Sequence, residues 1–256
     1  MIRGVFAAGV VLAAAMSCVF GGTAPPGAPS APIAIQISLP GDAADLSPAV
    51  RIVAILTLLA LAPSILMMTT CFVRVLIVFQ FLRTAIGAPQ VPANQVLLGL
   101  SLALTFFIMT PVASQIRTEA WEPYQRHEIS FEEAASRAES PLKAFMLSNV
   151  REKDLAMFVK LANIPRPETP RDLPLRVVAP SFLLSELKAA FQMGFLIFLP
   201  FLVVDLVVSS ILLSMGMLML PPTFISLPFK ILLFVLADGW TLVVGALVRS
   251  FHGVVA

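Results

Sequence analysis

The chain has 256 residues, of which 58% are hydrophobic and only 12% are charged, and its mean hydropathy is +0.93. Soluble domains carry about 25% charged residues, so this composition indicates a polytopic membrane protein rather than a soluble globular domain. The net charge of +2 gives no basis for nucleic-acid binding, and two histidines and two cysteines are too few and too scattered for a zinc or iron–sulfur site.

Residues 1–24 have the pattern of a cleaved secretory signal peptide. Arg3 precedes a short apolar core over 5–15, and small residues follow at 22–24. A first transmembrane helix is the alternative, but the apolar run is shorter than the ~20 residues that a span needs. A lipoprotein site at Cys18 is a weaker alternative. Residues 25–48, rich in Pro, Ala, Gly and Ser, predict a flexible extracytoplasmic lead-in.

Two apolar segments within residues 49–116 predict a first helical hairpin. The first segment, 50–82, is too long for one upright crossing of ~30 Å at ~1.5 Å per residue, so we expect a kink at Pro63. It contains Arg74, and an arginine inside an apolar segment is costly unless it faces water or finds a partner. The second segment, 96–116, follows a turn rich in Pro and Gly.

Residues 117–176 are much more polar and hold 20 of the chain's 32 charged residues, ten of each sign. The pattern predicts a small, mostly helical extracytoplasmic domain. One helix is expected to start at Ser130, with Glu133 completing a capping box, a second at Pro141, and a third over 152–162. The mixed charge indicates a solvated surface.

Residues 177–256 predict a second helical hairpin around an unusual loop. We expect its first apolar segment, 177–213, to be broken at Pro200, and its second to cover 228–248. The loop contains Gly216, which permits a tight turn, and the pair Pro221-Pro222, which is expected to stop the helix. Methionines alternate along it at Met215, Met217 and Met219. From composition alone, this is either a plain hairpin tip or a deformable contact surface.

The orientation follows from the expected leader. If residues 1–24 are cleaved off, the mature N-terminus lies on the extracytoplasmic side. The loop over 83–94 is then cytoplasmic, the 117–176 domain is extracytoplasmic, and the 214–227 loop returns to the cytoplasmic end. Arg74 and Arg83 support this orientation weakly, whereas Arg249 opposes it.

Ionisable residues inside apolar segments are functional hypotheses by default. In the second hairpin they are Glu186, Lys188, Asp205, Lys230 and Asp238. Three interpretations compete: structural pairing across helices or subunits, a proton or ion pathway through Asp205 and Asp238, and an intramembrane aspartyl protease. Against the protease, Asp238 lacks a glycine two residues earlier. The chain has no nucleotide-binding Gly-x-x-x-x-Gly-Lys loop and no convincing Ser/His/Asp set, so we expect neither an enzyme nor a cofactor.

Two long motifs carry a family resemblance. The stretch from Pro180 to Phe195 and the stretch from Pro228 to Trp240 resemble the two signatures of the FliP family of flagellar biosynthetic proteins, whose relatives serve type III secretion injectisomes. Residues 92–100 also resemble the family. The resemblance covers about 47–251 and is specific, because both motifs occur in the right order and spacing.

The resemblance implies an all-α membrane protein with about four long apolar helical segments. It implies a pentamer in the bacterial inner membrane, at the flagellar basal body, that joins FliQ-like and FliR-like subunits and other membrane proteins of the export apparatus. Unfolded rod, hook and filament subunits would pass through this export gate, driven by the proton-motive force and a separate ATPase. An injectisome gate subunit, or an independent ion or solute transporter using Asp205, Lys230 and Asp238, are the alternatives.

The resemblance also implies roles for individual residues. Met217, Leu218 and Met219 match a methionine gasket that narrows the pore, although the middle residue departs from an all-methionine triplet. Glu186 and Lys230 match positions of contacts between subunits, and their pairing is a hypothesis. Weaker candidates for subunit contacts are Phe145 and Phe158, and the ionisable residues expected to be buried are Arg74, Lys188, Asp205 and Asp238.

Overall fold

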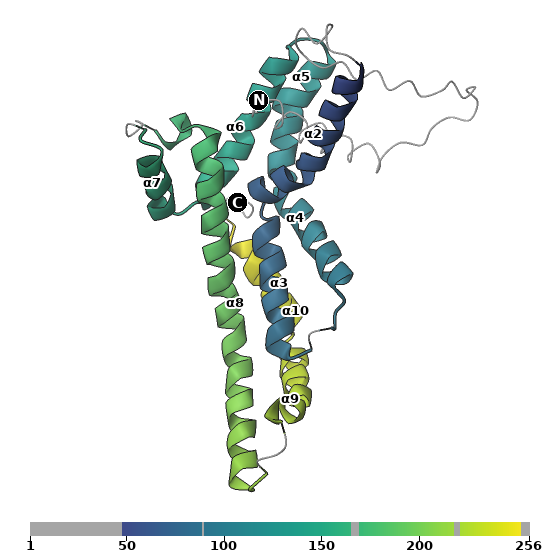
Figure 1. Cartoon of the computed structure of the whole chain (residues 1–256), viewed down its shortest axis with the longest axis vertical. Helices are drawn as coiled ribbons and strands as arrows, with labels where there is room; N and C mark the ends of the chain where they lie inside the picture. The colour runs from purple at the N-terminus through teal and green to yellow at the C-terminus, as the bar shows by residue number, and fades with distance from the viewer. Residues whose placement is uncertain (1–47, 89, 165–168, 218–220, 252–256) are drawn as a thin grey trace, which may run out of the picture. The chain divides into compact units, whose positions relative to one another are not determined.

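A computed structural model describes residues 48–88, 90–164, 169–217 and 221–251 (Figure 1). These residues form helices joined by short turns and contain no strand, which confirms the all-α prediction. The expected signal peptide and nearly all of the lead-in lie outside the described ranges. The chain divides into two compact units. Unit 1 includes the described residues 48–66 and 112–142, and unit 2 includes 67–111 and 143–251, so the expected 117–176 domain contributes residues to both.

Three longer helices contribute to unit 1 and continue past its boundaries: α2 (Pro48–Thr69), α4 (Asn94–Ile116) and α6 (Phe131–Asn149). Between α4 and α6 lie a π-helical turn, Arg117–Trp121, and the short helix α5, Glu122–Gln125. The ring of Tyr124 lies 6.4 Å from that of Trp121 and 6.0 Å from that of Phe131, measured between centroids. This aromatic row joins the turn to the start of α6.

Ser130 caps the start of α6, which is one half of the predicted capping box; the carboxylate of Glu133 instead accepts a bond from Arg137. The hydroxyl of Ser130 accepts a hydrogen bond from the backbone N–H of Glu133 at 3.3 Å. The prediction that a second helix begins at Pro141 is wrong, because α6 continues through this proline. Proline removes one intrahelical hydrogen bond. Ala138 and Met146, on either side of it, are buried.

Unit 2 is built on α8 (Leu175–Ser214), a helix of 40 residues that extends about 60 Å at 1.5 Å per residue. Helix α3 (Phe72–Ile86) packs along α8, as Figure 1 shows. Gly194 permits this approach, since a Cβ there would lie 2.5 Å from the ring of Phe81. The Phe81 ring also meets Phe191 edge-on at 5.3 Å. Helices α7 (Glu152–Leu161) and α9 (Pro222–Leu236) contact α8 as well.

Pro200 was expected to break an apolar helix and Pro63 to kink one, and both lie inside continuous helices. Helix α8 passes through Pro200 without a break, and α2 passes through Pro63 and ends only at Thr69. In long apolar helices one lost backbone hydrogen bond is tolerated because neighbouring groups satisfy the freed carbonyl. Helix α8 ends at Ser214, before the double proline. Pro222 is instead the first residue of α9, a position that needs no backbone donor.

The second apolar segment of this hairpin also differs from its expected course. Helix α9 begins at Pro222, contains Pro228 and ends at Leu236. A new helix, α10 (Gly239–Arg249), follows at an angle of 63°. Asp238, at the break, has a left-handed backbone with φ of 48°. A Cβ at Gly239 would lie 2.1 Å from the ring of Phe234, so the bend requires glycine at this position.

In the part of the chain that the structure describes, two helical segments are long and apolar enough to cross a membrane, Asn94–Gln125 and Leu175–Ser214. Two further segments pass the same test only as bent pairs, one of which joins α9 to α10. The prediction of about four long apolar helical segments therefore agrees with the structure, but two of the four are broken.

Candidate functional site

A buried ion pair in unit 2 joins α3 to α8. The Nε of Arg74 donates a hydrogen bond of 2.9 Å to Oε2 of Glu186, and Nη2 donates to Oε1. The side chains of Arg74 and Glu186 are 5% and 0% exposed. A forked guanidinium–carboxylate pair is strong and directional, and it satisfies both charges away from water. The pair therefore fixes the register of α3 against α8.

The remaining donors of Arg74 hold the end of the described chain. Its Nη1 donates to the backbone oxygen of Ser250 at 3.2 Å and to the Ser250 hydroxyl at 3.0 Å. The Arg74 guanidinium carbon also lies 4.0 Å from the centroid of the Phe251 ring, a cation–π contact. One arginine thus links α3, α8 and the segment after α10.

A second ion pair joins α7 to α8 on the neighbouring turn. Lys188 donates to Oδ1 of Asp154, and the Ser185 hydroxyl donates to Oδ2 at 2.9 Å. Burial disfavours the charged carboxylate, but the bonds from Lys188 and Ser185 outweigh it and lower the pKa of Asp154 below its ordinary value of 3.8. Ser185 also accepts a bond of 3.1 Å from the backbone N–H of Arg151, which fixes the start of α7.

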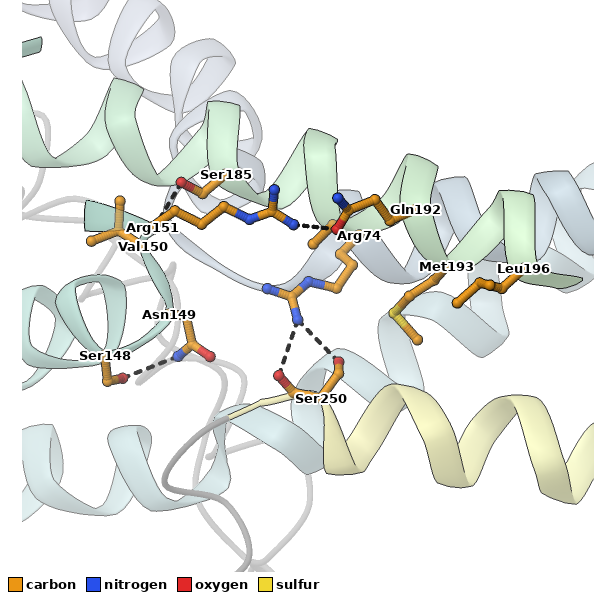
Figure 2. Close-up of a pocket in the computed structure, with 11 residues that line it drawn as sticks. Arg74, Ser148, Asn149, Val150, Arg151, Ser185, Gln192, Met193, Leu196 and Ser250 are labelled. Carbon is orange, nitrogen blue, oxygen red and sulfur yellow. Dashed lines mark hydrogen bonds between the residues drawn. The ribbon is translucent and has the colours of Figure 1, made fainter. Parts of the chain in front are cut away.

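Arg74 of the first pair and Ser185, which bonds Asp154 of the second, line a hollow of about 390 Å³. Figure 2 shows it between the turn joining α6 to α7, helix α8 and Ser250, with the guanidinium groups of Arg74 and Arg151 on its lining. Arg151 donates from Nη2 to Oε1 of Gln192 on α8. The other walls combine hydroxyl and amide groups with Met193 and Leu196.

A third ion pair lies farther along the α8–α9 hairpin. Lys230 donates to Oδ2 of Asp205 at 2.6 Å, and the Ser226 hydroxyl donates to Oδ1, also at 2.6 Å. The side chain of Lys230 is 7% exposed and that of Asp205 is 29% exposed. The Nζ of Lys230 also lies 3.8 Å from where a Cβ of Gly87 would stand, next to the left-handed turn that ends α3. The pair therefore joins the C-terminal part of α8 to α9 close to the end of α3.

The loop between α8 and α9 is closed by a defined cap. The backbone N–H of Gly216 donates to the oxygen of Leu213 at 3.1 Å, and that of Met217 donates to the oxygen of Leu212 at 3.0 Å. With φ of 74° at Gly216, these bonds form a Schellman cap, which confirms that this glycine permits the tight turn. Met215 and Met217 are exposed by 67% and 38%. Leu218 and Met219 lie outside the described residues.

The other predicted site residues are placed as follows. Glu186 and Lys230 each have a partner in their own chain, Arg74 and Asp205, so the hypothetical pair between them is not needed to neutralise either charge. Phe145 is only 6% exposed and packs on Phe182 and Phe251, so it is a core residue that leaves little surface for a subunit contact.

Two ionisable residues expected to be buried are exposed within the chain. The Lys188 side chain is 47% exposed, and Asp238 is exposed at the bend between α9 and α10. By contrast, Arg74 is buried as expected and Asp205 is half-buried. Phe158 is half-buried on α7.

Sequence reasoning missed the residues that complete these clusters: Arg151, Asp154, Ser185, Ser226, Ser250 and Phe251. Ser185 adjoins Glu186 within the first motif, and Ser226 lies one helical turn before Lys230, just ahead of the second motif, so their closeness to these charges could have drawn attention to both. No comparable signal marks Ser250 or Phe251. Among the described residues, no group of three or more His, Cys, Asp or Glu side chains could hold a metal ion.

Comparison with known proteins decides the family, because the model of the FliP family matches residues 55–247. The chain belongs to the FliP family. The flagellar biosynthetic protein FliP of Bacillus subtilis (strain 168) is 51% identical over 217 residues, which cover 85% of this chain and 98% of that protein. FliP of Aquifex aeolicus (strain VF5) is 54% identical over 210 residues, covering 81% and 88% of the two chains. FliP of Caulobacter vibrioides (strain ATCC 19089 / CIP 103742 / CB 15) is 51% identical over 227 residues, covering 89% and 85%.

The match to the FliP family includes the three ion pairs and the whole α8–α9 loop. Ser250 and Phe251, which contact Arg74, lie just beyond the matched residues. The resemblance predicted from the two motifs is confirmed.

Proposed function

We propose that the chain is a pore-forming core subunit of the flagellar type III protein export gate. Its membership of the FliP family and the name of its relatives, flagellar biosynthetic protein, support a role in flagellar biosynthesis. The long apolar helices support a place in the bacterial inner membrane, where the flagellar basal body assembles.

The observation that carries the proposal is the chemistry of the loop at the tip of the α8–α9 hairpin. The chain has no charged residue between Asp205 and Lys230. At the tip, a Schellman cap turns the backbone, and Met215 and Met217 stand exposed instead of packing between the helices. An exposed methionine pair on an uncharged tip is suited to meeting other copies of the same loop.

In the proposed gate, several copies of this loop surround one passage. Met217, Leu218 and Met219 form its gasket. Methionine is unbranched and polarizable, so a ring of such side chains closes the passage to small solutes and still adapts to the varied side chains of an unfolded export substrate. Leu218 seals as well as methionine but adapts less freely.

The proposed assembly is a pentamer that joins FliQ-like and FliR-like subunits. Helix α8 offers a large unpartnered apolar surface for these contacts, with Phe191, Phe195 and Val203 each more than half exposed. A continuous apolar surface of this kind marks a protein or lipid interface. Phe158 remains a proposed subunit contact, whereas the buried Glu186 and Lys230 would act within the chain, by fixing α3 and α9 against α8.

An independent ion or solute transporter is less well supported by the same structure. Asp205 is neutralised by Lys230 and bonded to Ser226, as a structural pair would be. An injectisome export gate has the same chemistry, but the three relatives described above carry flagellar names.

Purification tests the proposal. The tagged full-length chain is expressed with its FliQ-like and FliR-like partners, extracted in mild detergent and weighed by native mass spectrometry. The proposal expects five copies of the chain in a complex with both partners. A monomer without partners that conducts ions after reconstitution would favour the transporter.

A further inference from the structure

Helix α10 has a buried face and, opposite it, a stripe of residues that no other helix covers. The buried face consists of residues spaced by four, Gly239, Val243 and Leu247. The stripe follows the spacing i, i+4, i+7, i+11, which aligns its members along one side of a helix: Asp238, Leu242, Gly245 and Arg249. Leu242 is 61% exposed, and the charged residues at both ends of the stripe are exposed. We call these four residues the α10 stripe.

The two charges of the α10 stripe have no counter-charge in the described ranges. Neither Asp238 nor Arg249 forms an ion pair or a side-chain hydrogen bond there. Although Asp238 directly precedes the first turn of α10, its carboxylate does not cap the helix. The guanidinium of Arg249 lies over Gly245, where a Cβ would stand 3.1 Å from Nη2. Charges of opposite sign therefore stand unmatched, ~16 Å apart along α10 at ~1.5 Å per residue.

These unmatched charges belong to an apolar segment. Helices α9 and α10 qualify as a membrane span only together, as a bent pair, and Asp238 lies at the bend. Ionisable groups in such segments are costly unless they are paired or reach water. The other ionisable residues of the second hairpin are paired within the chain: Glu186, Lys188, Asp205 and Lys230. The α10 stripe is thus the part of this hairpin that has charges left for a partner.

The α10 stripe is complementary to a second copy of itself that runs in the opposite direction. In that arrangement Asp238 faces Arg249 of the second copy and Leu242 faces Gly245, and both contacts recur at the other end. Gly245 lets the two backbones approach closely, as small residues do between membrane helices, once Arg249 turns from it to the facing carboxylate. Two stripes running in the same direction would place like charges opposite each other, which is unfavourable.

The bend between α9 and α10 makes this arrangement compatible with one membrane. When α9 stands along the membrane normal, α10 is inclined to that normal by 63°. Two chains of the same orientation, related by a two-fold axis along the normal, can then bring their inclined α10 helices together in opposite directions. A contact of this kind uses the same surface on both chains.

We propose that two copies of this chain associate through their α10 stripes, with two Asp238–Arg249 ion pairs related by a two-fold axis. Neighbours in a cyclic pentamer are not related by a two-fold axis, so this contact is not one of the ring contacts of the proposed gate. It pairs the unmatched charges of chains that have not yet joined their partners. The inference goes beyond the proposed function, and either can fail without the other.

Cysteine cross-linking tests the two-fold contact. The full-length chain carrying both Asp238→Cys and Arg249→Cys is made without partner subunits, oxidised in membranes and separated on a non-reducing denaturing gel. We expect a covalent dimer and nothing larger, because two antiparallel stripes use both new cysteines of both chains. Wild type, which retains Cys18 and Cys71, and the two single variants measure the background. A ladder of trimers and larger species would indicate a head-to-tail contact and, like the absence of cross-links, would overturn the proposal.

Charge neutralisation tests the pair without relying on cysteine at the bend. Asp238→Asn keeps a residue that tolerates the left-handed backbone, and Arg249→Gln removes the cation. Dimer dissociation is measured in detergent by energy transfer between labelled copies. Each change should weaken the dimer about tenfold, and the double variant should be no weaker than either, because both remove the same pair. Arg176→Gln, exposed on α8 outside the stripe, is the matched control and should dimerise as wild type does. Losses that add in the double variant, or an equal loss in Arg176→Gln, would overturn the proposal.

Discussion

Arg74 and Glu186 are separated by 112 positions in the sequence, yet both oxygens of the Glu186 carboxylate accept hydrogen bonds from the Arg74 guanidinium. Neither side chain has appreciable contact with solvent. The same guanidinium bonds Ser250 and lies against Phe251. The pair therefore connects the first apolar hairpin, the long helix of the second and the end of the described chain.

Replacing Glu186 by alanine should destabilise the chain itself, not only its assembly. The change leaves the Arg74 charge buried without a counter-charge, which typically costs ~3–5 kcal/mol. We expect a large fall in the thermal unfolding temperature of the purified protein in detergent, together with impaired assembly. The matched control is Glu133→Ala, which removes half of an exposed pair with Arg137 and should cost less than about 0.5 kcal/mol. Equal melting of wild type and Glu186→Ala would contradict this role.

The Asp154–Lys188 pair predicts an acid-sensitive contribution to stability. The pKa of Asp154 is lower in the folded chain than its ordinary value of 3.8, so the folded state favours the ionised carboxylate. This contribution is present above pH 3.8 and is lost as the pH falls through the folded pKa. Asp154→Asn should therefore melt at a lower temperature than wild type at neutral pH, and the difference should shrink in acid. A difference that is unchanged in strong acid would contradict the assignment.

Close packing of α3 on α8 predicts that Gly194 tolerates no side chain. A Cβ at this position would stand 2.5 Å from the Phe81 ring, so Gly194→Ala forces the helices apart and should cost about 1–3 kcal/mol of unfolding free energy. Gly99→Ala is the control, because nothing lies within 4 Å of its Cβ position in α4, and alanine there should be neutral or stabilising by up to about 1 kcal/mol. Similar losses from both substitutions would mean that the α3–α8 contact is looser than described.

The left-handed backbone at Gly216 predicts that any residue with a Cβ at this position destabilises the loop. Its φ of 74° is strained for any residue with a Cβ, although open space surrounds the site. Gly216→Ala should therefore cost about 1 kcal/mol through the backbone alone. Gly216→Asn should lose less, because asparagine tolerates the left-handed region better. Thermal unfolding of the two variants checks the order, and equal losses would argue against the Schellman cap.

The sequence predicted the helical class, the positions of the apolar segments and the family, because hydropathy and two long motifs are local signals. It did not predict where helices end. Pro200 was expected to break a helix and Pro141 to begin a new one, but α8 and α6 continue through these prolines, so each helix tolerates one missing backbone hydrogen bond. The actual break at Asp238 depends on the fit of Gly239 against the Phe234 ring, which is visible only in three dimensions.

The site was predicted less completely than the fold. The charges inside apolar segments were identified, and structural pairing was among their interpretations, but the partners were not. Arg74 pairs with Glu186, and Asp205 with Lys230, because α3 and α9 pack against α8. This packing cannot be read from the spacing of residues along the chain. Asp154 looked like one of many solvated charges, and only its burial under Lys188 and Ser185 distinguishes it.

The most direct test of the proposed export gate is the permeability of cells that make it with an altered loop. In the test variant Met217, Leu218 and Met219 are all replaced by alanine, which shortens the three gasket side chains. The control variant carries Met217→Leu and Met219→Leu, which keep apolar bulk. We predict that the alanine variant assembles normally and leaks small solutes, measured as uptake of an impermeant fluorescent dye, while the leucine variant stays closed. Normal assembly with unchanged permeability in the alanine variant would contradict the account.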